Sequence, residues 1–450
     1  MSRLVDLSRR TPSSPSPGEI KQQWVDPSDI FSVLLILGGD VIQLACAAMA
    51  SGTVFPPNPV AFSFGWVAYA VSAVLSAIGE SRLISCPPEV AVKVINLKSR
   101  YCRQNNSWLL SRLMKTYHSW MSDEVRTHCG DSSEFSPPLP GLRTSNDDPE
   151  QLAETKHLSV SFTTRVGLCV AIYKWRDDYK PRNPIRDFLW WSGYAVSLVQ
   201  LGIAAIPFGL HNDWAIFFAT AAGTVLAYIS ASLPQWHHEK WHCRDRNKDV
   251  ALTLGNGTKA VIIIQGSDNG LDLEDLASGE VTELKMTQLQ VGGLCVLWII
   301  LLITCTGIQN HTWYLLAVGA IGMLHNIIVA AAPRTPEAMG LPIEPMPLDS
   351  SGGVERFAQI KVMWTLMELE LKYPGHGRAL RNEFFPGDLL PWEEEWWNLG
   401  MGENKMQIKE LNSKRLEVLN KKRIKWLRRQ EEKMEAKGER NCLPASDSDR

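Results

Sequence analysis

The sequence predicts a mainly α-helical membrane protein: six transmembrane helices in three in–out–in hairpins, with a small cytoplasmic β-containing region and amphipathic helices. Three observations predict this fold class. Six apolar runs are long enough for a bilayer core, which needs about 20 helical residues. The runs form three pairs, each joined by a short connection. Lys and Arg are found only on the side of the pairs opposite these connections.

The six predicted spans cover residues 30–50, 60–79, 188–208, 214–233, 289–308 and 313–332. Buried core helices of a soluble enzyme are the alternative, but six runs of full membrane length disfavour it. A net charge of −2 over 450 residues also argues against a nucleic-acid-binding protein. Nine scattered Cys without a CxxC pair indicate neither a disulfide framework nor a zinc ribbon.

Charge in the flanks predicts the orientation of the hairpins. The connections 51–59, 209–213 and 309–312 contain no Lys or Arg, whereas every opposite flank carries them. Because positively charged loops stay cytoplasmic, we expect both termini and all long hydrophilic segments in the cytoplasm. The polar N-terminus lacks the apolar core of a signal peptide, so the first run should remain as an anchor.

The chain therefore divides into eight predicted segments. They are a polar disordered N-terminus (1–29), hairpin 1 (30–79), a cytoplasmic segment with an amphipathic helix and short strands (80–187), hairpin 2 (188–233), a cytoplasmic segment with a β-hairpin (234–288), hairpin 3 (289–332), a cytoplasmic tail with an amphipathic helix (333–403), and a basic helix with a disordered end (404–450).

Short strands are predicted in two of the cytoplasmic segments. Residues 158–164 and 166–175 are rich in β-branched and aromatic residues, and 250–254 and 258–266 flank an Asn-Gly turn. We expect these strand pairs to join in one sheet. Amphipathic helices are predicted at 107–121 and at 357–373; Pro and Gly follow the second one.

An internal repeat links hairpins 2 and 3. Trp214, Gly223 and Pro234 are each followed 99 residues later by the same residue type. A duplication explains this spacing, although small residues are common wherever membrane helices pack closely.

Polar residues inside the predicted spans are candidates for a substrate or ion pathway. They are Asp40, Gln43, Gln200, His325 and Asn326. Because an ionisable group at this depth is costly, Asp40 and His325 are expected to face the bundle interior and are candidates for an ion-coupling pair. The alternative, which we favour, is a structural hydrogen-bond lock between helices.

A possible metal site follows the fourth span. His238, Glu239 and His242 fit H-E-x-x-H, in which two imidazoles bind zinc and the carboxylate acts as a base. Charged and polar flanks disfavour a zinc enzyme, and only Cys243 or Asp272 would be available nearby as a third ligand. We therefore predict no cofactor, with zinc as the one metal that the pattern raises.

The basic helix has a dense cluster of positive charge beside a Trp. Its members are Lys421, Lys422, Arg423, Lys425, Trp426, Arg428 and Arg429. Such a helix near a membrane indicates contact with anionic inner-leaflet lipid. A solvated or coiled-coil helix is an equally good interpretation, because the apolar spacing is irregular.

Stretches at 24–45, 183–217, 252–266 and 384–397 resemble a group of filamentous-fungal multi-pass membrane proteins of unknown function. The resemblance implies architecture and a fungal source, and it carries no catalytic residues. Three hypotheses about function follow: a non-enzymatic membrane scaffold or accessory protein, a small-solute or ion transporter using Asp40 and His325, and a metalloenzyme. The first is favoured, with lipid and unidentified cytoplasmic proteins as the expected partners.

Overall fold

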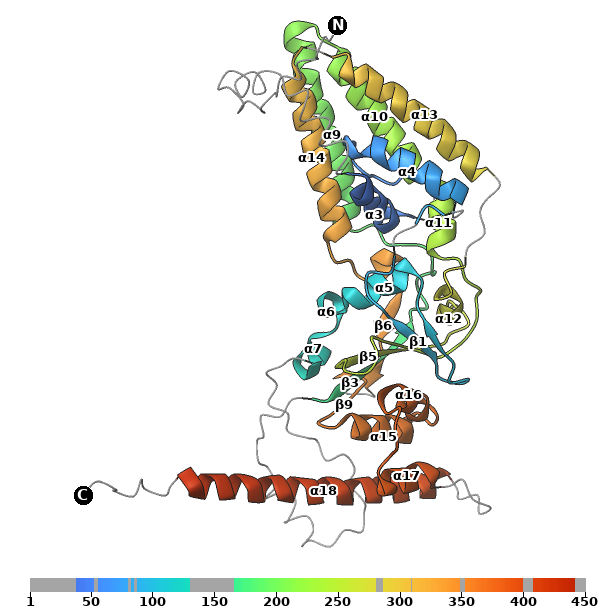
Figure 1. The fold of residues 1–450 in the computed structure, drawn as a ribbon, viewed down its shortest axis with the longest axis vertical. Helices are drawn as coiled ribbons and strands as arrows, with labels where there is room; N and C mark the ends of the chain where they lie inside the picture. Colours follow the sequence, from blue (N-terminus) through green and yellow to red (C-terminus); the bar gives the residue numbers. More distant parts are fainter. Residues whose placement is uncertain are drawn as a thin grey trace, which may run out of the picture.

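The computed structural model describes residues 38–51, 56–79, 82–84, 87–129, 166–280, 286–308, 310–348, 353–399 and 408–441. Figure 1 shows a helical bundle at one end of the long axis and an α/β domain below it. A long helix, α18, lies across the end of the domain farthest from the bundle (Figure 1).

Four helices of the bundle are long and apolar enough to cross a membrane. They are α9 (Phe188–His211), α10 (Ala215–Ala231) with its extension α11 (Pro234–Lys240), α13 (Thr287–Thr306) and α14 (Thr312–Ala331). The short connections within the pairs α9–α10 and α13–α14 lie at the end of the bundle away from the domain (Figure 1). These helices match the last four predicted spans and indicate a membrane protein.

The first predicted pair of spans has a different structure. Helix α3 (Gly39–Met49) has 11 residues and α4 (Gly65–Gly79) has 15, so both are shorter than a membrane core requires. The predicted span 60–79 is helical only from Gly65, and residues 30–37 lie outside the described residues. Six full-length spans are therefore not confirmed.

The connection between α3 and α4 lies beside the α/β domain. At the end of α3, the Ala50 carbonyl accepts a hydrogen bond from Lys240, which lies at the domain end of α11. The Asn58 amide donates to the Ala231 carbonyl, the last residue of α10. The chain then runs back into the bundle as a non-helical segment, residues 58–64, and α4 returns to the domain end. The described part of 51–59 is thus at the end opposite to the other two connections, contrary to the predicted arrangement.

A seven-stranded sheet forms the centre of the domain. Its order is β2-β1-β4-β5-β3-β6, and β9 also pairs with β3. The strands are β1 (Lys93–Asn96), β2 (Cys102–Gln104), β3 (Leu168–Trp175), β4 (Val250–Thr253), β5 (Ala260–Gln265), β6 (Ile343–Pro345) and β9 (Arg356–Gln359). Only the β3–β5 pair is parallel. A separate pair joins β7 (Pro347–Leu348) to β8 (Gly353–Val354).

The sheet confirms the prediction that strands from two hydrophilic segments pair. Strands β4 and β5 form the expected hairpin around the Asn-Gly turn, and β3 pairs with β5 from Cys169 to Lys174. The predicted strand at 158–164 lies outside the described residues. Residues 357–359, predicted as the start of a helix, belong to β9, so that helix begins only at Val362.

The two faces of the sheet belong to two cores. Alternate residues such as Val94, Tyr173 and Ile262 pack toward the bundle with helices α5 to α7 and α12, and their core is continuous with that of the bundle. The other face, including Val170 and Ile263, packs on α15 to α18. The helices are α5 (Trp108–Lys115), α6 (Tyr117–Trp120), α7 (Asp123–Cys129), α12 (Leu273–Leu276), α15 (Val362–Lys372), α16 (His376–Phe384), α17 (Pro391–Asn398) and α18 (Ile408–Asn441), with a short 3₁₀ turn at Glu337–Met339.

Candidate functional site

The non-helical segment 58–64 is bonded to the neighbouring helices by amide side chains. Asn326 of α14 donates to the Ala61 carbonyl at 2.9 Å and accepts from the Ala61 N–H at 3.2 Å. Gln200 of α9 donates to the carbonyls of Phe62 at 2.7 Å and Val318 at 2.8 Å. Both amides are fully buried. Backbone groups without helical partners are costly in a bilayer, and these two side chains supply the missing partners.

Small residues give the non-helical segment its space. A Cβ at Gly322 would overlap the Phe62 carbonyl oxygen, and one at Gly193 would overlap the Pro59 carbonyl oxygen. Gly223, which the 99-residue repeat pairs with Gly322, lies against the Phe62 ring. The two matched glycines therefore contact the same residue from α10 and α14.

The remaining candidate pathway residues do not converge on one site. Gln43 donates to the Leu83 carbonyl at 2.6 Å and holds the chain that follows α4. His325 contacts the Ser192 hydroxyl at 2.9 Å, which joins α14 to α9. Asp40 is exposed in the first turn of α3, and among the described residues no hydrogen bond or ion pair joins it to His325. The structure therefore supports the hydrogen-bond lock for the amides and gives the Asp40–His325 pair no support.

The H-E-x-x-H residues are placed at the junction of bundle and domain. Helix α11 ends at Lys240, so His242 lies beyond it; the rings of His238 and His242 are 4.7 Å apart between centroids. Both Glu239 oxygens accept hydrogen bonds, from the N–H groups of Leu83 and Ile84 at 2.7 Å each. In the described part of the chain, no group of three His, Cys, Asp or Glu side chains is arranged to hold a metal. Glu239 thus connects α11 to the chain that follows α4.

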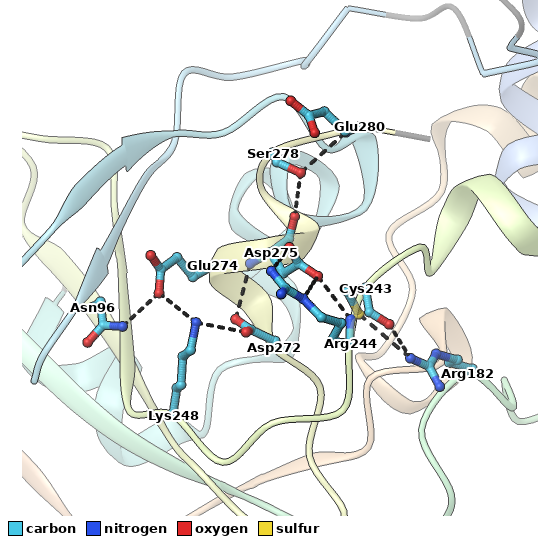
Figure 2. Close-up of polar contacts among 10 residues, drawn as sticks. All are labelled: Asn96, Arg182, Cys243, Arg244, Lys248, Asp272, Glu274, Asp275, Ser278 and Glu280. Atoms are coloured by element: carbon cyan, nitrogen blue, oxygen red, sulfur yellow. Dashed lines mark hydrogen bonds and ion pairs between the residues drawn. The ribbon is translucent and has the colours of Figure 1, made fainter. Parts of the chain in front are cut away.

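The two residues considered as a third zinc ligand belong to a polar cluster around α12, shown in Figure 2. Asp272 is fully buried, pairs with Lys248 at 2.7 Å and caps α12 through the N–H of Asp275. Burial raises the pKa of the Cys243 thiol to about 11, so it is not a thiolate at neutral pH. Arg244 and Asp275 form a bidentate pair that fixes the same loop. These contacts stabilise the fold around α12.

Three buried cations join the domain to the bundle. Arg112 of α5 donates to the Ala330 and Ala332 carbonyls at the end of α14. Arg334 and Lys240 both donate to the Ala48 carbonyl at the end of α3. Positive charge is favourable at helix C-termini, where carbonyls lack helical partners.

A pocket of about 240 Å³ opens beside Lys240. It lies between the end of α4, helix α5, the end of α11 and α12; its wall includes Arg82, Trp108, Glu239, Lys240 and His242. Because these residues are far apart in the sequence, no motif marks the pocket. The H-E-x-x-H pattern contributes Glu239, Lys240 and His242 to the wall.

The basic cluster of α18 is divided between two faces of the helix. Arg423 is buried and pairs with Glu368 of α15 at 2.8 Å, and Trp426 packs edge-on against Trp364 at 5.6 Å. Lys421, Lys422, Lys425, Arg428 and Arg429 are exposed. The helix lies at the opposite end of the domain from the bundle (Figure 1), so two of the seven predicted lipid-contacting residues instead face the domain.

No protein-family model matches this chain, and searches of curated proteins and of solved structures also find no match. The functional argument therefore depends on the geometry above.

Proposed function

We propose that this protein is a non-enzymatic membrane scaffold, in which the helical bundle anchors the α/β domain and the domain presents α18 to cytoplasmic proteins. The observation that carries this proposal is the set of contacts made by Arg112, Lys240 and Arg334 with helix ends. They fix the orientation of the domain relative to the bundle, which an anchor for a recognition surface requires.

The polar groups of the bundle support the same proposal. The side-chain amides of Gln200 and Asn326 donate to backbone carbonyls and so connect segments of the bundle to one another. At the junction, the Glu239 carboxylate likewise bonds to the backbone, since it accepts from the N–H groups of Leu83 and Ile84. The chemistry expected of a transporter or a metalloenzyme has no set of converging side chains in the described part of the chain.

The exposed face of α18 is the proposed recognition surface. Arg423, Trp426 and Leu427 hold one face of this helix on the domain, while the basic residues listed above are exposed. Of these, Lys422 also lies over the Trp392 ring of α17, 5.4 Å from its centroid. This surface would take an acidic protein partner. The positively charged flanks favour a cytoplasmic position for it.

Complementation of cells that lack the protein tests the proposal against its alternatives. We expect Asp40→Asn and His238→Ala to restore the wild-type phenotype, and Lys421→Glu combined with Lys425→Glu, two exposed positions of α18, to fail at normal expression. A matched Lys98→Glu change on the exposed loop between β1 and β2 should restore it. Loss of function with Asp40→Asn alone would support transport, and loss with His238→Ala alone would support metal chemistry.

A further inference from the structure

Lys240 is a buried lysine whose side chain is bonded to backbone carbonyls rather than to a carboxylate. Its side chain is 3% exposed, and its ammonium donates to the Ala48 and Ala50 carbonyls at 3.2 and 3.3 Å. It also lies 4.6 Å from the centroid of the Trp241 ring. Among the described residues it forms no ion pair.

Arg334 provides a direct comparison. Both cations donate to the Ala48 carbonyl, but Arg334 also pairs with both oxygens of Asp187, at 2.8 and 3.0 Å. A buried charge is normally paired, because its transfer from water is costly. Lys240 has no such ion pair among the described residues, and it lines the pocket of about 240 Å³ between α4, α5, α11 and α12, which we call the junction pocket.

The rest of the wall also favours an anion. Arg82 is half-buried, and its guanidinium makes no hydrogen bond or ion pair within the described part of the chain. The Trp108 side chain is 5% exposed, and its indole N–H has no hydrogen-bond partner there. His242 adds an imidazole. The one carboxylate in the wall, Glu239, accepts hydrogen bonds from Leu83, Ile84 and Gln235.

We propose that the junction pocket binds a phosphate monoester anion, held by Arg82, Lys240, His242 and the indole N–H of Trp108. Arg and Lys with additional N–H donors form the usual set for such an anion. The volume of about 240 Å³ is below the roughly 300–1,000 Å³ of sites for drug-sized ligands, so a small headgroup fits better than a nucleotide.

The position of the pocket favours a lipid as the source of the phosphate. Arg82 follows the end of α4, and Lys240 is the last residue of the apolar helix that begins at Ala215. The ends of membrane-spanning helices lie at the depth of the lipid headgroups. A phosphatidic acid headgroup can therefore reach the pocket from the bilayer, and a soluble phosphate monoester offers the same chemistry from the water side.

Binding to the purified full-length protein in detergent tests the site. The probes are short-chain phosphatidic acid, phosphatidylcholine of the same chain length, and glycerol 3-phosphate. Affinity is measured for the wild type and for Arg82→Gln, Lys240→Met and the matched control Arg246→Gln, which changes an exposed arginine of the next loop. Thermal unfolding of each variant reports whether it folds, because Lys240 also holds the end of α3.

We expect phosphatidic acid to bind, phosphatidylcholine not to bind, and Arg82→Gln to weaken binding by about tenfold or more, since a charge-assisted hydrogen bond is lost. Arg246→Gln should leave the affinity unchanged. Glycerol 3-phosphate binding with equal affinity and equal sensitivity to Arg82→Gln would support the site with a soluble ligand. Equal binding of phosphatidic acid and phosphatidylcholine, or an Arg82→Gln protein that is folded and binds as the wild type does, would overturn the proposal.

Discussion

The first hairpin and the two later hairpins contain similar apolar sequence but satisfy their backbones differently. In α9, α10, α13 and α14 the peptide groups bond within each helix. In the first hairpin, residues 58–64 are non-helical, and the peptide groups of Ala61 and Phe62 bond to Asn326 and Gln200 of the later hairpins. The later hairpins therefore form a frame, and the first hairpin depends on it. Buried amides in a bundle can thus indicate an irregular segment nearby rather than a transport pathway.

Cysteine labelling should show the largest difference between the first hairpin and the later ones, because each position is labelled from only one side of the membrane. In a background without the nine native cysteines, Pro56→Cys should be labelled from the same side as Lys98→Cys in the domain. His211→Cys, at the connection of α9 to α10, should be labelled from the opposite side. Labelling of position 56 together with position 211 would restore the regular hairpin and contradict the fold described here.

Removal of the amide at position 326 should have the largest effect on stability. Asn326→Leu leaves the Ala61 N–H and carbonyl buried without their partners, which costs about 1 to 3 kcal/mol for each group. Unfolding in detergent by heat or denaturant measures the loss.

The matched control for Asn326→Leu is Thr220→Val in α10. The Thr220 hydroxyl donates to the Ile216 carbonyl of its own helix, so we expect a loss of only about 1 kcal/mol. Equal losses of stability for the two variants would mean that the non-helical segment does not depend on Asn326.

A methyl group added at Gly322 tests whether the non-helical segment needs the space beside this glycine. Gly322→Ala should destabilise the protein by about 1 to 3 kcal/mol, because the new Cβ overlaps the Phe62 carbonyl oxygen. Gly292→Ala in α13 is the control, since no atom lies within 4 Å of the Cβ that it adds. That variant should keep or slightly raise the unfolding temperature. A neutral Gly322→Ala would show that the segment can move away from α14.

Acidification should weaken the carboxylate contacts of the domain but not the side-chain amide hydrogen bonds of the bundle. This is the smallest of the expected effects on stability. The Arg244 guanidinium holds the pKa of Asp275 below its ordinary value, so this pair stabilises the fold above about pH 4. Its contribution is lost as the pH falls through the lowered pKa. Asp275→Asn should cost about 0.2 to 1 kcal/mol at pH 7, because the pair is partly exposed.

The measurement is the difference in unfolding temperature between wild type and Asp275→Asn at pH 7 and pH 3. This difference should shrink on acidification, whereas the difference between wild type and Asn326→Leu should not, because amides do not titrate. A difference for Asp275→Asn that grows at low pH would show that the carboxylate is not held by Arg244.

The predictability of the fold follows from what hydropathy measures. Long continuous apolar runs indicate α9, α10, α13 and α14, and a β-branched run beside Asn-Gly indicates β4 and β5. Hydropathy does not distinguish a helical from a non-helical conformation of the apolar residues 60–64. Their conformation depends on hydrogen bonds to Asn326 and Gln200, more than a hundred positions away in the sequence. The sequence assigns most of strand β9 to a helix, because its residues lie close to α15 and fit the helical spacing of apolar residues.

The candidate site was predictable only in part. The cost of burying polar groups drew attention to Gln200 and Asn326, but sequence gave no indication that their partners are backbone groups. The junction pocket joins residues 82, 108, 240 and 242, whose proximity arises from the packing of four elements. The predicted lipid contact of residues 421–429 stays a prediction, narrowed to the exposed face of α18.

The strand order of the sheet has a consequence for biosynthesis. The central strand β3 is made before α9, its parallel neighbour β5 after α11, and its other neighbours β6 and β9 only after α14. A ribosome must therefore deliver both later hairpins to the membrane before the hydrogen bonds of β3 can be completed. Until then its edges remain open to wrong pairing, and the nascent domain needs shielding. Closure of the sheet would then mark a chain whose last hairpin has been inserted.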